Sequence, residues 1–178
     1  FIFYENKYIK RDTNKSIHYF TLASEQNHSD SQYSLGFIYV FDKSIKRDIQ
    51  KGIYYLSLAV NQNNSKAQCT LYKIYFKGIY IEKNINKAIY YLSSAAKLNN
   101  PIAQYNLALH FINGYHVKKN MIRGVDLLIQ SSLNGIHEAY FYVAFFYFEG
   151  KYVQKDVKKS IDYYKKASSF NVNHAKNN

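Results

Sequence analysis

The stretch RDIQKGIYYLSLAVNQNNSKAQ, residues 47–68, returns thirty-six residues later as KNINKAIYYLSSAAKLNNPIAQ, residues 83–104. The same interval relates positions outside these two segments. Small, branched, aromatic and glycine positions each recur in this way: Ala67, Ala103, Ala139 and Ala175; Leu35, Leu71, Leu107 and Val143; Tyr39, Tyr75, Phe111 and Tyr147; Gly78, Gly114 and Gly150. A register that holds along the chain predicts an internal structural repeat.

Each repeat is predicted to be a pair of helices. Ala67 and Leu71 are four residues apart, so they lie on one side of a helix that Gly78 is suited to end. Asn84 is a good N-cap for a second helix, which the Asn-Asn-Pro segment at 99–101 ends. The expected helices lie near residues 31–41, 49–62, 67–77, 85–98, 102–113, 121–133, 137–149 and 157–170.

The helical pairs are predicted to stack, because a single pair cannot bury its apolar side. The predicted organisation is a partial repeat at 1–30, repeats at 31–66, 67–102, 103–138 and 139–174, and the start of a further helix at 175–178. Residues 1–5 and 173–176 look like truncated helices. The sequence starts at Phe1 without an initiator Met, so we expect it to be a piece of a longer protein.

The pattern A-x3-L-G-x2-Y-x2-G-x2-V-x2-D-x2-K-A-x2-Y-x3-A in these units resembles the Sel-one-like repeat, a relative of the tetratricopeptide repeat. Unit 31–66 departs from it with Asp42 in place of the loop glycine. Unit 103–138 has Asp126-Leu127 and Ser131 where the neighbouring units have Tyr-Tyr and Ala, so its local packing should differ. The resemblance implies an all-α, right-handed α-solenoid of stacked helix-turn-helix repeats. It also implies an adaptor in a multiprotein assembly, such as the substrate-recruiting subunit of the endoplasmic-reticulum degradation ligase, or a cytosolic signalling or assembly factor, and the sequence does not choose between them.

Composition limits the function classes. With 178 residues, of which 47% are hydrophobic, the chain can bury a core, but it lacks the roughly 20 consecutive apolar residues of a membrane span. The net charge of +12 suggests nucleic-acid binding, yet it comes almost wholly from Lys, with only three Arg. Because Asn, Lys, Ile and Tyr are all abundant, a bias of codon composition explains the charge better, and nucleic acid is a disfavoured partner.

No residues are predicted to carry catalysis, a metal or a cofactor. The six His residues show no ligand spacing, and only His110 and His116 lie near one another in the sequence. Cys69 is a lone cysteine, which excludes an internal disulfide. The sequence contains neither a G-x-G-x-x-G nor a G-x-S-x-G motif. The chain is therefore predicted not to be an enzyme.

A second apolar stripe on the first helix of each unit is the candidate partner site. Resemblance to tetratricopeptide arrays implies that these positions line a concave groove, which would receive a peptide or helix. The predicted groove residues are Tyr33, Phe37, Val40, Phe41, Lys73, Phe76, Tyr105, Leu109, Ile112, Phe141, Phe145 and Phe148. The alternative is that the same residues pack between repeats.

A row of cations precedes the second helix of each unit. This basic edge consists of Arg11, Arg47, Lys83, Lys119 and Lys155. A cation in the first turn opposes the helix dipole, so its recurrence indicates a packed aliphatic stem or a partner carboxylate. We favour the structural interpretation, with an acidic partner or anionic lipid along this edge as the alternative.

The sequence as a whole predicts a non-catalytic protein-interaction scaffold within a larger assembly, which binds a partner peptide or helix in the aromatic groove. The alternative is a basic array that binds an acidic partner, nucleic acid or anionic lipid. The sequence contains no targeting segment, so it leaves the endoplasmic-reticulum lumen and the cytoplasm equally open.

Overall fold

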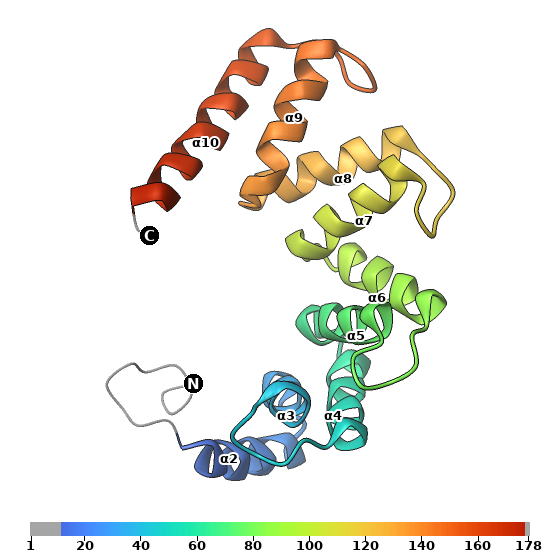
Figure 1. Ribbon diagram of the computed structural model, residues 1–178, viewed down its shortest axis with the longest axis vertical. Coiled ribbons are helices and arrows are strands. Elements are labelled where there is room, and N and C mark those ends of the chain that lie inside the picture. Colours follow the sequence, from blue (N-terminus) through green and yellow to red (C-terminus); the bar gives the residue numbers. More distant parts are fainter. Residues whose placement is uncertain (1–11, 177–178) are drawn as a thin grey trace. The chain divides into compact units, whose positions relative to one another are not determined.

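The computed structural model describes the backbone of residues 12–176 and the side chains of residues 12–169. Over this part of the chain it contains nine α-helices and no strand (Figure 1). The helices are α2 (Thr13–Glu25), α3 (Ser29–Phe41), α4 (Ile49–Asn61), α5 (Ser65–Lys77), α6 (Ile85–Lys97), α7 (Pro101–Asn113), α8 (Met121–Leu133), α9 (His137–Glu149) and α10 (Val157–Lys176). The predicted all-α helical repeat fold is confirmed.

The helices pack as consecutive hairpins. Helix α3 packs on α4, α7 on α8, and α9 on α10, and each contact lies within one of two compact units, residues 1–91 and 92–178. None of the helices in the described part of the chain is long and apolar enough to cross a membrane.

Side-chain caps fix where the second helix of each pair begins. The Asp48 carboxylate accepts a hydrogen bond from the Lys51 backbone N–H at 2.9 Å, and Asn84 accepts one from Lys87 at the same distance. The same cap is made by the residues at the equivalent positions: Asp12, Asn120 and Asp156. Each cap pairs one of the backbone N–H donors that a helix start leaves without an intrahelical partner. Removing such a cap costs about 0.5–2 kcal/mol of stability.

Three of the first helices begin slightly earlier than predicted. Helices α3, α5 and α7 start at Ser29, Ser65 and Pro101, against expected starts at 31, 67 and 102. The reason is the cap, because the side chains of His28, Asn64 and Asn100 accept from the backbone N–H three residues on.

The end of the last helix also differs from the prediction. Helix α10 continues to Lys176, whereas the sequence predicted an end near residue 170 and a new helix at 173–176. No Gly or Pro interrupts residues 170–176, so nothing in the local sequence ends the helix there. The predicted truncated helix at 1–5 lies outside the described residues.

The loop glycine of each unit is required by its backbone. Gly78, Gly114 and Gly150 have φ of 66°, 74° and 68°, the left-handed region in which glycine ends a helix. In the unit that lacks this glycine, Asp42 has an extended backbone with φ of −71°. Its carboxylate instead accepts hydrogen bonds from the Ser44 backbone N–H at 2.9 Å and hydroxyl at 2.7 Å.

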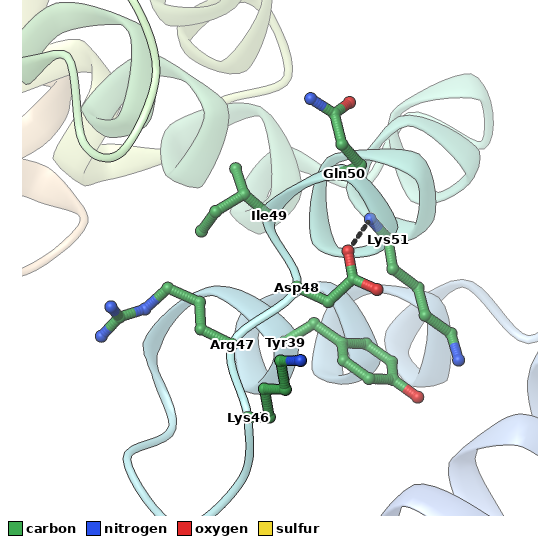
Figure 2. Close-up of a pocket in the computed structure, with 7 residues that line it drawn as sticks. All are labelled: Tyr39, Lys46, Arg47, Asp48, Ile49, Gln50 and Lys51. Carbon is green, nitrogen blue, oxygen red and sulfur yellow. Dashed lines mark hydrogen bonds between the residues drawn. The ribbon is translucent and has the colours of Figure 1, made fainter.

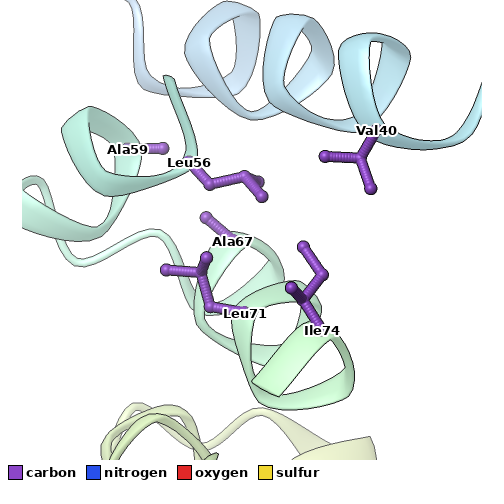
Figure 3. Packing of buried hydrophobic residues seen from close by; sticks show 6 residues of the cluster. All are labelled: Val40, Leu56, Ala59, Ala67, Leu71 and Ile74. Carbon is purple, nitrogen blue, oxygen red and sulfur yellow. The ribbon is translucent and has the colours of Figure 1, made fainter. Parts of the chain in front are cut away.

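Two clusters of the buried core are each made by one hairpin and the first helix of the next. In the first, Val40 of α3 and Leu56 of α4 meet Ala67, Leu71 and Ile74 of α5 (Figure 3). In the second, Ala108 of α7 and the α8 pair Val125 and Leu128 meet the α9 residues Ala139, Val143 and Phe146. In these two clusters the apolar side of the hairpin is covered by the following first helix.

Unit 103–138 packs differently at the two departures noted in its sequence. Ser131 is fully buried where its neighbours have Ala, and its hydroxyl donates a hydrogen bond to the Pro101 carbonyl at 2.9 Å. Leu127 stands where the other units place a tyrosine that stacks on the preceding helix. The predicted local difference is therefore present.

Replacing Ala95 by Leu should lower the free energy of unfolding by about 1–3 kcal/mol, because overpacking strains a filled core. Ala95 is fully buried on α6, whereas Lys97 on the same helix is exposed. Lys97→Leu is therefore the matched control, and it should change stability little. Chemical denaturation measures both, and equal midpoints for the two variants would show that this side of α6 does not face the core.

Candidate partner-binding surfaces

Five of the twelve predicted groove residues pack between hairpins. Val40 is fully buried in the first core cluster, so its prediction as a surface residue is wrong: α5 covers it. Tyr33 and Phe41 pack against the same cluster, and Tyr105 and Ile112 pack against the second. For these five positions the alternative interpretation, that they pack between repeats, applies.

The remaining predicted groove residues of α3, α5 and α7 are mostly half-buried. Phe37 lies between the rings of Tyr33 and Phe41, with centroids 6.2 and 5.0 Å away. Phe76 and Leu109 are also half-buried, and Lys73 is exposed.

The aromatic side of α9 is open. Phe141, Phe145 and Phe148 are 59%, 46% and 49% exposed. Phe141 makes an edge contact with Tyr164 of α10, with ring centroids 5.7 Å apart. The Lys155 ammonium lies 5.6 Å from the centroid of the Phe148 ring. This helix therefore presents three large apolar side chains to solvent, with a cation at one end.

The basic edge is built of packed cations. The Arg47 guanidinium lies 3.8 Å from the Tyr80 ring centroid, and its Nε donates to the Val40 carbonyl at 3.0 Å. The Lys83 ammonium lies 5.7 Å from the Phe76 ring.

The stems of the lysines on this edge lie against the loop glycines. A Cβ placed on Gly114 would lie 3.1 Å from Cβ of Lys119, and one on Gly150 would lie 2.7 Å from Cβ of Lys155. These contacts agree with the structural interpretation of the edge. Arg11, the first member of the row, lies outside the described residues.

A second row of cations rests on aromatic rings, and the sequence analysis did not predict these contacts. The Lys51 ammonium is 4.5 Å from the ring centroid of Tyr39, which stacks on Tyr55 with centroids 5.9 Å apart. The Lys87 ammonium lies over Tyr75, which stacks on Tyr91, and the Lys159 ammonium lies over Tyr147, which stacks on Tyr163. The Arg123 guanidinium lies over the Phe111 ring. The constant interval of twelve residues between ring and cation is the signal that could have revealed it.

This row also shapes the surface at the start of α4. A shallow pocket of about 460 Å³ is lined by Tyr39, Lys46, Arg47, Asp48 and Lys51, among others (Figure 2). Arg47 and Lys51 extend in opposite directions, and the Asp48 carboxylate is turned to the Lys51 backbone N–H. A hydrogen bond with Tyr39 is the main cause that raises the pKa of Lys51, so this ammonium stays charged. The cations do not converge on one point.

The described residues contain no cluster of three or more metal-ligating side chains. Burial raises the pKa of the Cys69 thiol to about 11, so this side chain is protonated at neutral pH and is a poor nucleophile. His110 is buried, with its Nδ1–H donating to the Tyr115 carbonyl at 2.9 Å, and its ring centroid is 5.7 Å from that of His116. In the next unit the same two positions hold Phe146 and Tyr152, also in ring contact.

Comparison with known proteins gives one family. The Sel1 repeat model matches residues 2–28, 29–64, 73–100, 101–136 and 137–169. A search of curated proteins finds no match.

Solved structures share the fold. A Sel1 repeat protein from Oxalobacter formigenes superposes with a TM-score of 0.87 at 22% identity, covering 94% of this chain and 49% of that one. The protective antigen c5321 of uropathogenic Escherichia coli gives 0.80 at 24% identity, over 94% and 36% of the two chains. Cysteine rich protein B of Helicobacter pylori gives 0.58 at 29% identity, over 75% and 96%. The chain thus spans half or less of the first two relatives.

Replacing His110 by Ile, the residue at the equivalent positions 38 and 74, should flatten the dependence of stability on pH. Burial lowers the pKa of His110 below its ordinary value. As the pH falls, the unfolded chain therefore binds a proton at this side chain before the folded chain does. Stability is therefore lost as pH falls through the unfolded pKa of about 6.5, and the loss stops below the folded pKa. Denaturation at pH 7.5 and 5.5 measures the effect, with exposed His18→Gln as control. An unchanged pH dependence in His110→Ile would contradict the assignment.

Proposed function

The chain belongs to the Sel1 repeat family, and we propose that it is a non-catalytic scaffold that binds a partner protein through the aromatic side of α9. Sel1 repeat proteins are generally protein-interaction scaffolds. A ligase adaptor of the endoplasmic reticulum is one member of this class. Family membership does not say which residues contact a partner, and we assign this contact to Phe141, Phe145 and Phe148.

The observation that carries the proposal is the exposure of Phe141, Phe145 and Phe148 on one helix. Large apolar side chains gathered on a surface are costly to hydrate, and such patches mark sites of association. Aromatic side chains are also the residues that most often dominate binding energy at protein interfaces.

The basic edge is the second candidate, because the chain has a net charge of +12. Its cations would attract an acidic partner or an anionic lipid. Against this, the charged groups of Arg47, Lys83 and Lys155 lie over aromatic rings of their own chain, which is a structural use of the residues. Charge-driven binding would weaken steeply with added salt, whereas aromatic contacts would not.

We expect Phe141→Ala with Phe145→Ala to weaken binding of the purified natural partner by at least about tenfold, since each buried Phe contributes roughly 1.5–3 kcal/mol. The partner is first identified by co-purification at physiological salt, and its affinity is then measured at low and physiological salt. Ile122→Ala, at an apolar residue that is 69% exposed on α8, is the matched control and should bind normally.

The charge-reversed pair Lys83→Glu and Lys119→Glu tests the basic edge in the same assay. We expect this variant to keep most of its affinity at physiological salt. Full retention by the aromatic variant, with loss confined to the charge-reversed one, would overturn the proposal in favour of the basic edge.

A further inference from the structure

A pocket lies between the second helices α6 and α8, in the unit whose sequence departs from its neighbours. Its volume is about 300 Å³, at the lower end of the range for ligand pockets, and all of its lining residues belong to the compact unit 92–178. Helices α6, α7 and α8 all contribute to the lining, which includes Ala96, Leu107, Arg123, Asp126, Leu127 and Gln130.

In the next unit a tyrosine crosses the equivalent junction. Tyr163 stands at the position of Leu127, and its ring stacks on that of Tyr147 with centroids 6.1 Å apart. The Tyr163 hydroxyl lies 3.4 Å from the hydroxyl of Ser132 on α8. Ser132 corresponds to Ala96, which lines the pocket. The tyrosine thus reaches the preceding second helix, whereas Leu127 has neither the ring nor the hydroxyl to do so.

Leucine at this position is an exception among the units. Tyr55 and Tyr91 occupy it in the two preceding units, and each stacks on a tyrosine of the helix before it, with centroids 5.9 Å apart. The pocket therefore lies where unit 103–138 lacks the ring that its neighbours carry.

The walls of the pocket suit a ring that bears a hydroxyl group. Ala96, Leu107 and Leu127 supply apolar contacts, and Asp126 and Gln130 supply polar ones. The Nε2 of Gln130 donates a hydrogen bond to Oδ2 of Asp126 at 2.8 Å.

A cation also lines the pocket. The guanidinium of Arg123 lies 4.7 Å from the centroid of the Phe111 ring. Guanidinium groups stack readily on aromatic rings, so a ring that enters beside Arg123 gains a favourable contact.

A buried amide next to the pocket has an unused acceptor. Gln104 is 1% exposed, and its Nε2 donates to Oε1 of Gln130 at 3.1 Å and to Oδ1 of Asn99 at 3.4 Å. Both of these partners line the pocket. The Oε1 atom of Gln104 has no hydrogen-bond partner. A hydroxyl group both donates and accepts, so it can bond to such a polar wall.

We propose that this pocket binds the phenol ring of a tyrosine side chain on a bound peptide. The ring contacts Ala96, Leu107 and Leu127, and the hydroxyl bonds to the polar wall. Acidic residues beside the tyrosine are favoured, because Lys97 and Arg123 line the pocket and the chain has a net charge of +12. None of the aromatic residues of α9 lines it, so this site is independent of the proposed function.

The first test is binding of p-cresol, the tyrosine side chain as a free molecule, to the 178-residue chain by NMR. We expect a dissociation constant on the order of millimolar, with shifts at the amides of residues 93–99 and 123–130. The control 4-methylcyclohexanol keeps the hydroxyl but lacks the flat ring, and it should bind at least about threefold more weakly. Absent binding, equal binding of the two compounds, or shifts confined to other residues would each overturn the inference.

Leu127→Tyr should fill the pocket with a ring of the chain itself. We expect p-cresol to bind this variant at least about tenfold more weakly, and the denaturation midpoint to rise because a cavity is filled. Leu22→Tyr, the same change at a residue that is 44% exposed on α2, is the matched control and should bind p-cresol as the parent does. Undiminished binding by folded Leu127→Tyr would contradict the inference.

A second variant tests the hydroxyl contact and does not depend on the folding of the first. Gln130→Leu carries the residue of the equivalent position 58 and removes an amide from the polar wall. Toluene, which has no hydroxyl, should bind this variant and the parent about equally, whereas p-cresol should bind the variant at least about threefold more weakly. An unchanged affinity for p-cresol would show that the polar wall does not hold the hydroxyl.

Two short peptides distinguish a tyrosine side chain from a free phenol. N-acetyl-Asp-Tyr-Asp-amide and N-acetyl-Asp-Leu-Asp-amide differ only in the central side chain. The tyrosine peptide should bind the parent at least about threefold more tightly, and Leu127→Tyr should remove this difference. Equal binding of the two peptides, in a chain that binds p-cresol in the pocket, would overturn the choice of a peptide as the source of the ring.

Discussion

The packing of α5 on the hairpin α3–α4, and of α9 on the hairpin α7–α8, is the contact on which the rest of the structure depends. A hairpin of two thirteen-residue helices has too little apolar surface facing inward to be stable alone. The covering helix completes the core, and side chains such as Leu71 and Val143 become fully buried. Each of these contributes roughly 1.5–3 kcal/mol relative to an exposed side chain. The repeat of the sequence follows from this constraint, since a first helix that covers the preceding hairpin also belongs to a hairpin with an apolar side of its own.

The same constraint separates surface that is already used from surface that is left for a partner. Tyr33 and Phe41 of α3 and Tyr105 of α7 pack against the core clusters that the next first helix completes. Many of the cations rest on tyrosine and phenylalanine rings of their own chain. A basic, aromatic composition therefore does not by itself describe a binding surface. Large apolar side chains are exposed on α9, and the proposed function rests on Phe141, Phe145 and Phe148.

Much of the fold could be predicted because its determinants are local and periodic. The interval of thirty-six residues, the N-cap at Asp48 and the loop glycine at Gly78 each act within a few residues of their position. The candidate site could not be predicted as well, because burial depends on which helix lies opposite. Val40 and Phe148 occupy equivalent positions, yet one is fully buried and the other is 49% exposed. The contact of Lys51 with Tyr39 was also not predicted, because it depends on how the two helices of one hairpin lie against each other.

Hydrogen exchange of the 178-residue chain tests the central claim most directly, because it measures the opening of each hairpin separately. If the following first helix stabilises a hairpin, the slowest amides of α8, which α9 covers, should exchange at least about tenfold more slowly than those at residues 161–169 of α10, a difference of about 1.4 kcal/mol in opening free energy. Equal protection of the two helices would contradict the account, since the open hairpin would then be as stable as the covered one.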